Sequence, residues 1–326
     1  MERLPVAIIG LGSMGRNHVR VLSSLAEVEL IAVCDSDPKR LISGKWMQVT
    51  DYRDVRASDF AYCVVATPTL THLEVCKHFL SEGVPVLLEK PAASTADEVK
   101  ELIAARTEHA GHVSVGMIER FNRTAQEARN LVMSKQMGSL LKMAMCRVGP
   151  PPGREMGVGV LTDLGIHDLD LARWITGSEV SSSQALAVSR VVSSHEDYVL
   201  LSGHLAGGAI ISVELSWLHP LKQRSIEMLF TSGLARFDLL SGEVSLSESS
   251  EETIEWDAVR EFFGTGRAKR MVYGVKTVEP LVVEHQSMVR AVQTGDWSNL
   301  PSLEESLQLL ESLETMEFQS PRKAVL

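Results

Sequence analysis

The segment Asp163-Leu-Gly-Ile-His167 places a carboxylate and an imidazole four residues apart in a run with regularly spaced apolar residues. That spacing predicts a helix over about 160–176. Side chains four residues apart on a helix share one face, so Asp163 and His167 can point together into one cleft. A histidine held beside a carboxylate suits a general base. Taken alone, such a pair is more often a contact on a helix surface, so its meaning depends on the rest of the chain.

A glycine-rich segment near the N-terminus predicts a dinucleotide site. Gly10-Leu-Gly12-Ser-Met-Gly15 follows the apolar run Leu4–Ile9 and opens an amphipathic stretch. Gly10 permits a tight turn, Gly12 lets the backbone approach a pyrophosphate, and Gly15 lets the helix pack close to the strand. The free N–H groups of the helix N-terminus then face the phosphates. Asp35, at the end of the next apolar run, is placed to accept ribose hydroxyls and repel a 2′-phosphate, which favours NAD over NADP.

A third candidate group, Glu89-Lys90-Pro91, ends the apolar run Val84–Leu88. In open parallel sheets ligands bind outside the carboxyl ends of the strands, so we expect Lys90 to project toward the cofactor. A lysine ammonium there can hydrogen-bond a substrate hydroxyl and stabilise the alkoxide that develops as hydride leaves. A solvated lysine at a strand end is the alternative. Pro91 can take the cis form, which would fix the aim of Lys90.

Another strand-end loop, residues 66–72, can contact the nicotinamide ribose, although His72 is equally well explained as a residue of a helix N-terminus. Lys39 and Arg40 could approach a 2′-phosphate, which keeps NADP as the alternative cofactor. The residues expected to bind the cofactor are Gly10, Gly12, Ser13, Met14, Gly15, Asp35, Thr67, Pro68, His72, Glu89 and Lys90.

The elements that must position these residues predict a doubly wound α/β domain with a parallel sheet. Residues 4–116 alternate short apolar runs with longer amphipathic stretches, which is typical of βαβ units. Ser94 or Thr95 is the expected N-cap of the last helix. The expected strands are Leu4–Ile9, Leu30–Cys34, Met47–Thr50, Phe60–Val65, Val84–Leu88 and His112–Val115; the expected helices are 13–25, 70–82 and 95–109, with one abbreviated helix within 36–57.

From about residue 120 the pattern changes to consecutive strands with Gly-Gly and Ser-Gly turn signals. This predicts an α+β domain with a large, mostly antiparallel sheet. The Ser- and Glu-rich residues 242–256 and the Gly- and basic-rich residues 264–276 read as exposed loops or edge segments. The expected strands are 140–148, 183–193, 198–205, 209–217, 226–231 and 234–238; the expected helices are 160–176, 278–294 and 303–318.

We therefore divide the chain into an NAD-binding Rossmann domain, residues 1–119, and a substrate-binding and oligomerisation domain, residues 120–326. One face of the second sheet must be covered by helices. Its other face is expected to carry apolar residues such as Leu200, Ile211, Val213 and Leu215. An exposed apolar sheet face usually marks association, so a homo-oligomer, dimer or tetramer, is expected.

Composition excludes several classes of function. The net charge of −10 argues against nucleic acid, whose binders carry basic patches. No apolar run approaches the length needed to span a membrane, and the first strand begins too early for a signal peptide. Cys34, Cys63, Cys76 and Cys146 lack metal-type spacing, and no metal site is expected. A reduced cytoplasmic protein is the interpretation that fits these thiols.

The order of these motifs resembles the glucose–fructose oxidoreductase, inositol dehydrogenase and MocA (Gfo/Idh/MocA) family of nicotinamide-dependent sugar dehydrogenases. The matching pieces run from the glycine turn to the helix of Asp163 and His167. The resemblance implies that Lys90 and His167 flank the reacting hydroxyl, with Asp163 beside them. One departure is the stretch Gly157-Val-Gly159-Val160, which is looser than the family's usual run of glycines.

Further strings resemble the family branch that oxidises the 3-hydroxyl of UDP-N-acetylglucosamine. They are Glu119–Asn122, Arg147–Pro151, Glu196–Tyr198, Trp217–Arg224 and Glu279–Leu281, with Arg123 where that branch commonly has proline. A sugar diphosphate would need some of the scattered cations, although any single one is as easily a surface salt-bridge partner. The residues expected to bind substrate are Arg120, Asn122, Arg147, Arg154, Lys222 and Arg224.

The sequence thus predicts a dehydrogenase that transfers hydride from a ring hydroxyl to NAD, with His167 or Lys90 as the proton acceptor and Asp163 as its orienting acid. The first alternative is the same chemistry on another polyol: inositol, a free aldose or a UDP-uronic acid. The second alternative is a non-catalytic NAD-binding regulator. Such a protein would have little reason to keep Lys90, Asp163 and His167 together.

Overall fold

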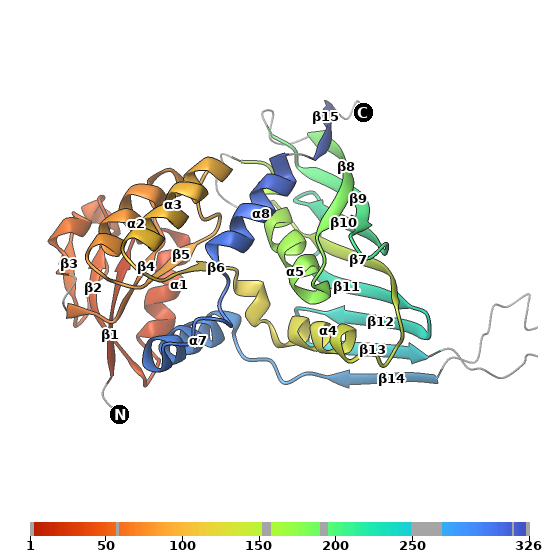
Figure 1. The fold of residues 1–326 in the computed structure, drawn as a ribbon, viewed down its shortest axis with the longest axis horizontal. Coiled ribbons are helices and arrows are strands. Elements are labelled where there is room, and N and C mark those ends of the chain that lie inside the picture. The colour runs from red at the N-terminus through yellow and green to blue at the C-terminus, as the bar shows by residue number, and fades with distance from the viewer. Residues whose placement is uncertain are drawn as a thin grey trace, which may run out of the picture. The chain divides into compact units, whose positions relative to one another are not determined.

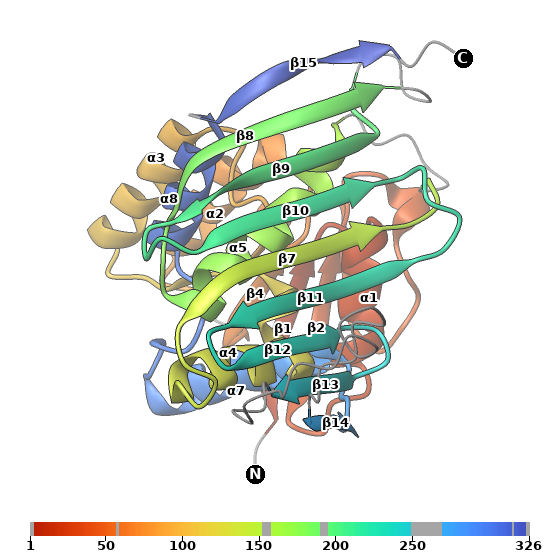
Figure 2. The ribbon, with the colours of Figure 1, turned by 90° about the vertical axis from the view of Figure 1, so that its right-hand side faces the viewer.

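The computed structural model describes residues 3–56, 59–151, 158–189, 195–248, 269–314 and 316–323, except the side chains of residue 182 and of 317–323. Contacts divide the chain into two compact units (Figure 1, Figure 2). Unit 1 comprises Met1–Phe121 and Val278–Glu314, and unit 2 comprises Asn122–Thr277 and Thr315–Leu326. The predicted single division between residues 119 and 120 therefore differs from the observed one, because residues 278–314 return to unit 1.

Unit 1 contains the expected doubly wound sheet, in which all strands are parallel in the order β3-β2-β1-β4-β5-β6. The central strands are buried on both faces, which explains why they are continuous apolar runs rather than alternating ones. The expected fold class is confirmed. The strands are β1 (Leu4–Ile9), β2 (Val28–Cys34), β3 (Met47–Val49), β4 (Tyr62–Val65), β5 (Val86–Glu89) and β6 (Val113–Gly116).

The helices of unit 1 cover both faces of this sheet. Thr95 is the N-cap of α3, because its side chain accepts a hydrogen bond from the Glu98 amide. The segment 36–57 contains two short 3₁₀ turns, Pro38–Arg40 and Tyr52–Asp54, in place of one abbreviated helix. The other helical segments are α1 (Ser13–Leu22), α2 (His72–Ser81), α3 (Ala96–Glu108), α7 (Pro280–Thr294), α8 (Leu303–Glu314) and the 3₁₀ turns Thr69–Thr71 and Ile118–Phe121.

The two helices near the C-terminus belong to unit 1, although the sequence division placed them in the second domain. Leu281 and Met288 of α7 join the buried core that Val6 and Ile8 of β1 begin. Helix α8 packs against α3, where Arg106 pairs with Glu304. Apolar periodicity predicted both helices but could not indicate which sheet they cover, because that depends on contacts far apart in the sequence.

Unit 2 is built on a nine-stranded sheet in the order β14-β13-β12-β11-β7-β10-β9-β8-β15. Strand β7 pairs with β10 in parallel, as β8 does with β15, and the remaining pairs are antiparallel. The strands are β7 (Leu140–Val148), β8 (Val180–Ser189), β9 (Tyr198–Leu205), β10 (Ile210–Ser216), β11 (Gln223–Phe230), β12 (Gly233–Asp238), β13 (Glu243–Glu248), β14 (Lys269–Gly274) and β15 (Glu317–Lys323).

Helices α4 (Arg123–Ser134) and α5 (Ile166–Thr176) lie on one face of this sheet, and Figure 2 views its other face. Ile211, Val213 and Leu215 are fully buried on the helix-covered face. The expectation that they lie on an exposed face is therefore wrong, whereas Leu200 is 40% exposed. Strand residues alternate between faces, so the odd-numbered residues of β10 point inward together. None of the helices described is long and apolar enough to cross a membrane.

The core of unit 1 contains one carboxyl group with no hydrogen-bond partner among the described residues. Glu284 of α7 is 1% exposed, and neither of its oxygens has a partner. Burial raises the pKa of Glu284 well above its ordinary value, and the nearby Glu89 carboxylate adds to this shift. Desolvation disfavours the charged form, so the folded protein holds Glu284 as the neutral acid.

Glu284 should make the stability of the protein fall as pH rises. Above about pH 4.3 an unfolded Glu is ionised, while the folded state keeps the proton, so each pH unit up to the folded pKa costs about 1.4 kcal/mol. Glu284→Gln cannot ionise and should remove this cost. Urea denaturation at pH 5 and pH 8 should show that the free energy of unfolding of the variant, relative to that of the wild type, is higher at pH 8 than at pH 5. A difference between the two proteins that is the same at both pH values would contradict the assignment.

Candidate functional site

The glycines of the turn after β1 differ in what surrounds them: two are packed against backbone and one faces open space. Gly10 has φ +95°, and a Cβ there would lie 2.5 Å from the Ala66 carbonyl oxygen. A Cβ on Gly15 would overlap the carbonyl oxygen of Gly10. A Cβ on Gly12 would meet nothing within 4 Å. The chain's own packing therefore explains Gly10 and Gly15, while the open space at Gly12 fits a close approach by a pyrophosphate.

Asp35 lies directly after β2, beside the glycine turn, and is almost fully buried. Its Oδ2 accepts a hydrogen bond from the Leu11 amide at 2.8 Å, and its Oδ1 accepts one from the Asp37 amide at 2.9 Å. Each carboxylate oxygen keeps a second lone pair, which can accept from a ribose hydroxyl. Ser13 and Met14 open α1, whose N-cap carries no side-chain hydrogen bond, so the amides of this first turn are available to an anion.

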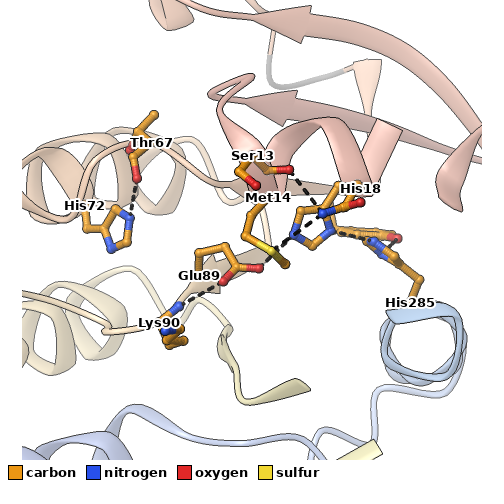
Figure 3. Close-up of polar contacts among 10 residues, drawn as sticks. Ser13, Met14, His18, Thr67, His72, Glu89, Lys90 and His285 are labelled. Carbon is orange, nitrogen blue, oxygen red and sulfur yellow. Dashed lines mark hydrogen bonds and ion pairs between the residues drawn. The ribbon is translucent and has the colours of Figure 1, made fainter. Parts of the chain in front are cut away.

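His72 joins two strand-end loops of the same sheet. Its Nδ1 lies 3.0 Å from the carbonyl oxygen of Pro91, and its Nε2 lies 3.0 Å from that of Thr67 (Figure 3). Burial lowers the pKa of His72, although the two carbonyls act in the opposite direction. Each ring nitrogen therefore contacts a backbone carbonyl oxygen, and His72 connects the loop of Thr67 to the loop of Pro91. The Lys90–Pro91 peptide bond is cis, as the sequence allowed.

Glu89 and Lys90 end β5 at the same carboxyl edge. One Glu89 carboxylate oxygen lies 2.9 Å from Nε2 of His18, and the other accepts from the Lys90 amide at 3.2 Å (Figure 3). His18 Nδ1 lies 2.9 Å from Nε2 of His285, whose Nδ1 lies 3.1 Å from the Tyr62 hydroxyl. The Glu89–Lys90 turn is therefore held from inside unit 1 by a chain of buried polar side chains.

In unit 2, Asp163 lies just before α5 and His167 lies in its first turn, and both are half-buried. Asp163 belongs to a π-helical turn, Leu161–Gly165, and His167 to the first α-helical turn that follows. Single π turns within helices occur frequently at functional sites. A Cβ on Gly165 would lie 2.9 Å from Leu215 Cδ1, so this glycine lets the wide turn pack closely on β10.

The backbone at the start of this helix is held by Glu196. Its carboxylate accepts from the Leu161 amide at 3.0 Å, and its carbonyl accepts from the Val160 amide at 3.0 Å. A Cβ on Gly159 would overlap the same carboxylate, which explains a glycine there. Glu196 thereby satisfies amide groups that the helix itself leaves without partners.

Two of the expected substrate-binding cations lie near this helix in unit 2. Arg147 is 3% exposed, and its Nε donates to Asp168 of α5 at 2.8 Å. Arg224 is the cross-strand neighbour of Arg147 and donates to the Val148 carbonyl at 3.0 Å. The ion pair of Arg147 with Asp168 therefore holds α5 against the sheet. Lys222, a third expected cation of unit 2, is exposed.

The remaining expected substrate residues serve internal contacts or are not described. Arg120 is buried in unit 1, where it pairs with Glu305 of α8 at 2.7 Å. Asn122 is the N-cap of α4, because its Oδ1 accepts from Thr124, and its Nδ2 donates to the Leu239 carbonyl. Arg154 and Gly157 lie outside the described residues.

Sequence reasoning missed the residues that support the site from behind. His18 follows the glycine turn by three residues, so its place one turn into α1 was available from the sequence. His285 offered no local signal, because its partner lies 267 positions away. Glu196 belongs to one of the strings that resemble a family branch, but its contact with the start of α5 could not be read from that string. Only the folded chain brings these side chains to the residues they hold.

Comparison with known proteins shows the family of the chain. Residues 4–117 match the family model described as "Oxidoreductase family, NAD-binding Rossmann fold", and residues 125–236 match the GFO/IDH/MocA C-terminal domain. The rhizopine catabolism protein MocA of Rhizobium meliloti is 27% identical over 249 residues, covering 72% of this chain and 78% of that protein. The inositol 2-dehydrogenase of Ralstonia nicotianae is 29% identical over 225 residues, covering 65% and 67%.

Solved structures share the whole fold. The UDP-N-acetylglucosamine 3-dehydrogenase GnnA from Acidithiobacillus ferrooxidans has a TM-score of 0.83 at 20% identity and covers 97% of each chain. An oxidoreductase from Agrobacterium radiobacter, solved with NAD+, L-tartaric acid and magnesium, has a TM-score of 0.79 at 20% identity, with coverage of 97% of this chain and 95% of that one. With both family models matched in order, the chain belongs to the Gfo/Idh/MocA family of NAD-binding oxidoreductases.

Proposed function

We propose that this oxidoreductase oxidises a secondary ring hydroxyl of a sugar, with C3 of UDP-N-acetylglucosamine as the first candidate substrate and NAD as the cofactor. The observation that carries the reaction type is the carboxyl edge of the sheet in unit 1. The glycine turn after β1, Asp35 after β2, Thr67 after β4 and Lys90 after β5 all lie along that edge. Ligands of open parallel sheets bind there.

In this proposal each site residue has one task. Lys90 donates a hydrogen bond to the substrate hydroxyl and stabilises the developing alkoxide. His167 or Lys90 accepts the hydroxyl proton, and Asp163 orients the imidazole or holds a neighbouring hydroxyl. Bound NAD supplies the hydride acceptor. Asp35 accepts the ribose hydroxyls and repels a 2′-phosphate, which makes NAD the preferred cofactor.

The choice of UDP-N-acetylglucosamine rests on two likenesses: the five sequence strings noted above, and the fold of a solved UDP-N-acetylglucosamine 3-dehydrogenase. Among the described cations, Arg224 and Lys222 are the best placed to bind a diphosphate. Arg224 lies on β11 opposite Arg147, which contacts α5, and Lys222 is exposed.

Inositol is the second candidate, and a specific observation favours it. Arg120 and Arg147, two of the cations expected to bind the diphosphate, are buried and paired with Glu305 and Asp168. An uncharged cyclic polyol needs no such cations. Relatives at 26–29% identity also include inositol 2-dehydrogenases.

We also propose that the protein forms a homo-oligomer through the open face of the nine-stranded sheet. Leu186, Leu200, Ile210 and Leu229, from four of its strands, are each at least 40% exposed, which is unusual for apolar side chains in regular strands. Light scattering should give a mass that is a multiple of 35.8 kDa. A monomer at micromolar concentration would exclude this association.

The reaction should be visible with the purified protein. Incubation with NAD and a panel of UDP-N-acetylglucosamine, a UDP-uronic acid, inositol and free aldoses should reduce the cofactor with one class only, and mass spectrometry should find a product two hydrogens lighter. Tight NAD binding without reduction by any of these compounds would favour a non-catalytic regulator instead.

Lys90→Met should lower kcat by about 10² to 10⁴-fold, since it removes the group that stabilises the alkoxide. The Kd for NAD should change little, because the turn's backbone is kept. Lys77→Met is the matched control, since Lys77 lies on α2 and pairs with Glu101 on the surface. Activity of Lys90→Met close to that of the control would refute the role of Lys90.

Asp35→Asn should shift cofactor preference toward NADP. The amide keeps one oxygen for a backbone amide but loses the charge that repels a 2′-phosphate, so the Kd ratio of NADP to NAD should fall by about tenfold. Fluorescence titration with both cofactors measures this ratio. Asp97→Asn, which neutralises an exposed acid in the first turn of α3, should leave the ratio unchanged, and an equal shift in both variants would exclude a specific role for Asp35.

A further inference from the structure

Four buried side chains in unit 1 form one continuous hydrogen-bonded chain that ends at the Glu89–Lys90 turn. The Tyr62 hydroxyl lies 3.1 Å from His285 Nδ1, His285 Nε2 lies 2.9 Å from His18 Nδ1, and His18 Nε2 lies 2.9 Å from Glu89. Tyr62, His18 and His285 are fully buried. The four residues come from β4, α7, α1 and β5, so the chain connects separate parts of unit 1 (Figure 3).

With one proton on each imidazole, the partners allow one direction of hydrogen donation. A Glu89 carboxylate can only accept, and it accepts from both His18 Nε2 and the Lys90 amide. A neutral His18 that donates from Nε2 must accept at Nδ1, so His285 donates from its Nε2. His285 then accepts at Nδ1 from the Tyr62 hydroxyl. Every ring nitrogen is satisfied by this single set of tautomers.

The surroundings keep His285 and Tyr62 of this chain uncharged. Burial lowers the pKa of His285 well below its ordinary value, with His18 as a second cause, so His285 is neutral. Burial raises the pKa of Tyr62, which keeps its proton, and Glu284 beside the chain is held as the neutral acid. Glu89 is therefore the carboxylate on which this arrangement converges.

We propose that His18 is a positioning residue of the oxidation: by donating to Glu89 from a ring that His285 holds in one tautomer, it fixes the carboxylate that in turn binds the Lys90 amide. The lysine is then presented in one orientation to the substrate hydroxyl. This inference rests on the proposed function and deepens it, because it assigns the aim of Lys90 to a residue that contacts neither substrate nor cofactor.

A purely structural role would predict a different chemistry for these positions. A core gains more from apolar side chains than from a polar chain of the same volume, since each buried polar group must be fully satisfied to avoid a penalty. Among the described residues, these three polar side chains are satisfied through one another and Glu89. Their common end point is the turn that carries Lys90, which is where precise orientation affects rate most.

The test compares His18→Leu, which removes the donor to Glu89, with His18→Gln, whose amide can keep it. His18→Leu should lower kcat by about 10 to 100-fold, as expected for a misplaced catalytic group, with the Kd for NAD changed less than about threefold. His18→Gln should recover at least half of that loss on a logarithmic scale. The control is His112→Leu, whose ring stacks on Trp297 in the same unit outside the chain, and its kcat should match the wild type.

Nitrogen NMR of the wild type reports which ring nitrogen of His18 and of His285 carries the proton. Its signals are assigned by comparison with the variants, and the measurement does not depend on the activity of any variant. His18 and His285 should both be neutral with the proton on Nε2. Protonation of either His18 or His285 on Nδ1 would overturn the proposal, as would wild-type kcat in His18→Leu or equal losses in His18→Leu and His112→Leu. Absence of turnover by the wild type itself would refute the proposed function, whereas turnover with an unimpaired His18→Leu would refute only the positioning role.

Discussion

The close packing of Gly15 on the carbonyl oxygen of Gly10 is the constraint on which the arrangement of unit 1 depends. A side chain at either position would collide with backbone, so α1 must begin directly against the end of β1. This contact fixes where the helix starts and therefore where its next turn lies. His18 is in that turn, within hydrogen-bonding distance of Glu89 on β5. One pair of glycines thus determines both the surface offered to a dinucleotide and the support behind the lysine.

Unit 2 positions its candidate residues by a different device. Asp163 lies in a wide π turn, which needs both a glycine at 165 to approach Leu215 and the Glu196 carboxylate to satisfy its first amides. The buried ion pair of Arg147 with Asp168 then fastens the following helix to the sheet. Removing one partner of such a pair would leave an uncompensated buried charge, so these residues form a support in which each member depends on the others.

Elements with a strong local pattern could be predicted from the sequence, and those without one could not. Strand β1 was predicted to the residue because its apolar run ends at a glycine turn. Helix α4 was missed, because its buried face consists of the small residues Thr124, Ala125 and Ala128. Strands β13 and β14 lie within the segments expected to be exposed loops or edge segments, and β14 is indeed the exposed edge strand of the sheet. The cations at 120 and 147 were expected to bind substrate, because charge alone does not reveal that each is paired with an acid inside the fold.

The return of residues 278–314 to unit 1 has a consequence for how the chain folds as it is made. Helix α7 contributes Leu281 and Met288 to the core of the first sheet and His285 to the support of Glu89. None of these residues has been synthesised when the ribosome completes residue 121, so the nascent dinucleotide domain lacks both α7 and α8. The apolar surface that α7 later covers therefore stays exposed, or transiently covered by other segments, while unit 2 is translated. Completion of unit 1 is thus a late event, and the order of domains along the gene is not the order in which they become finished.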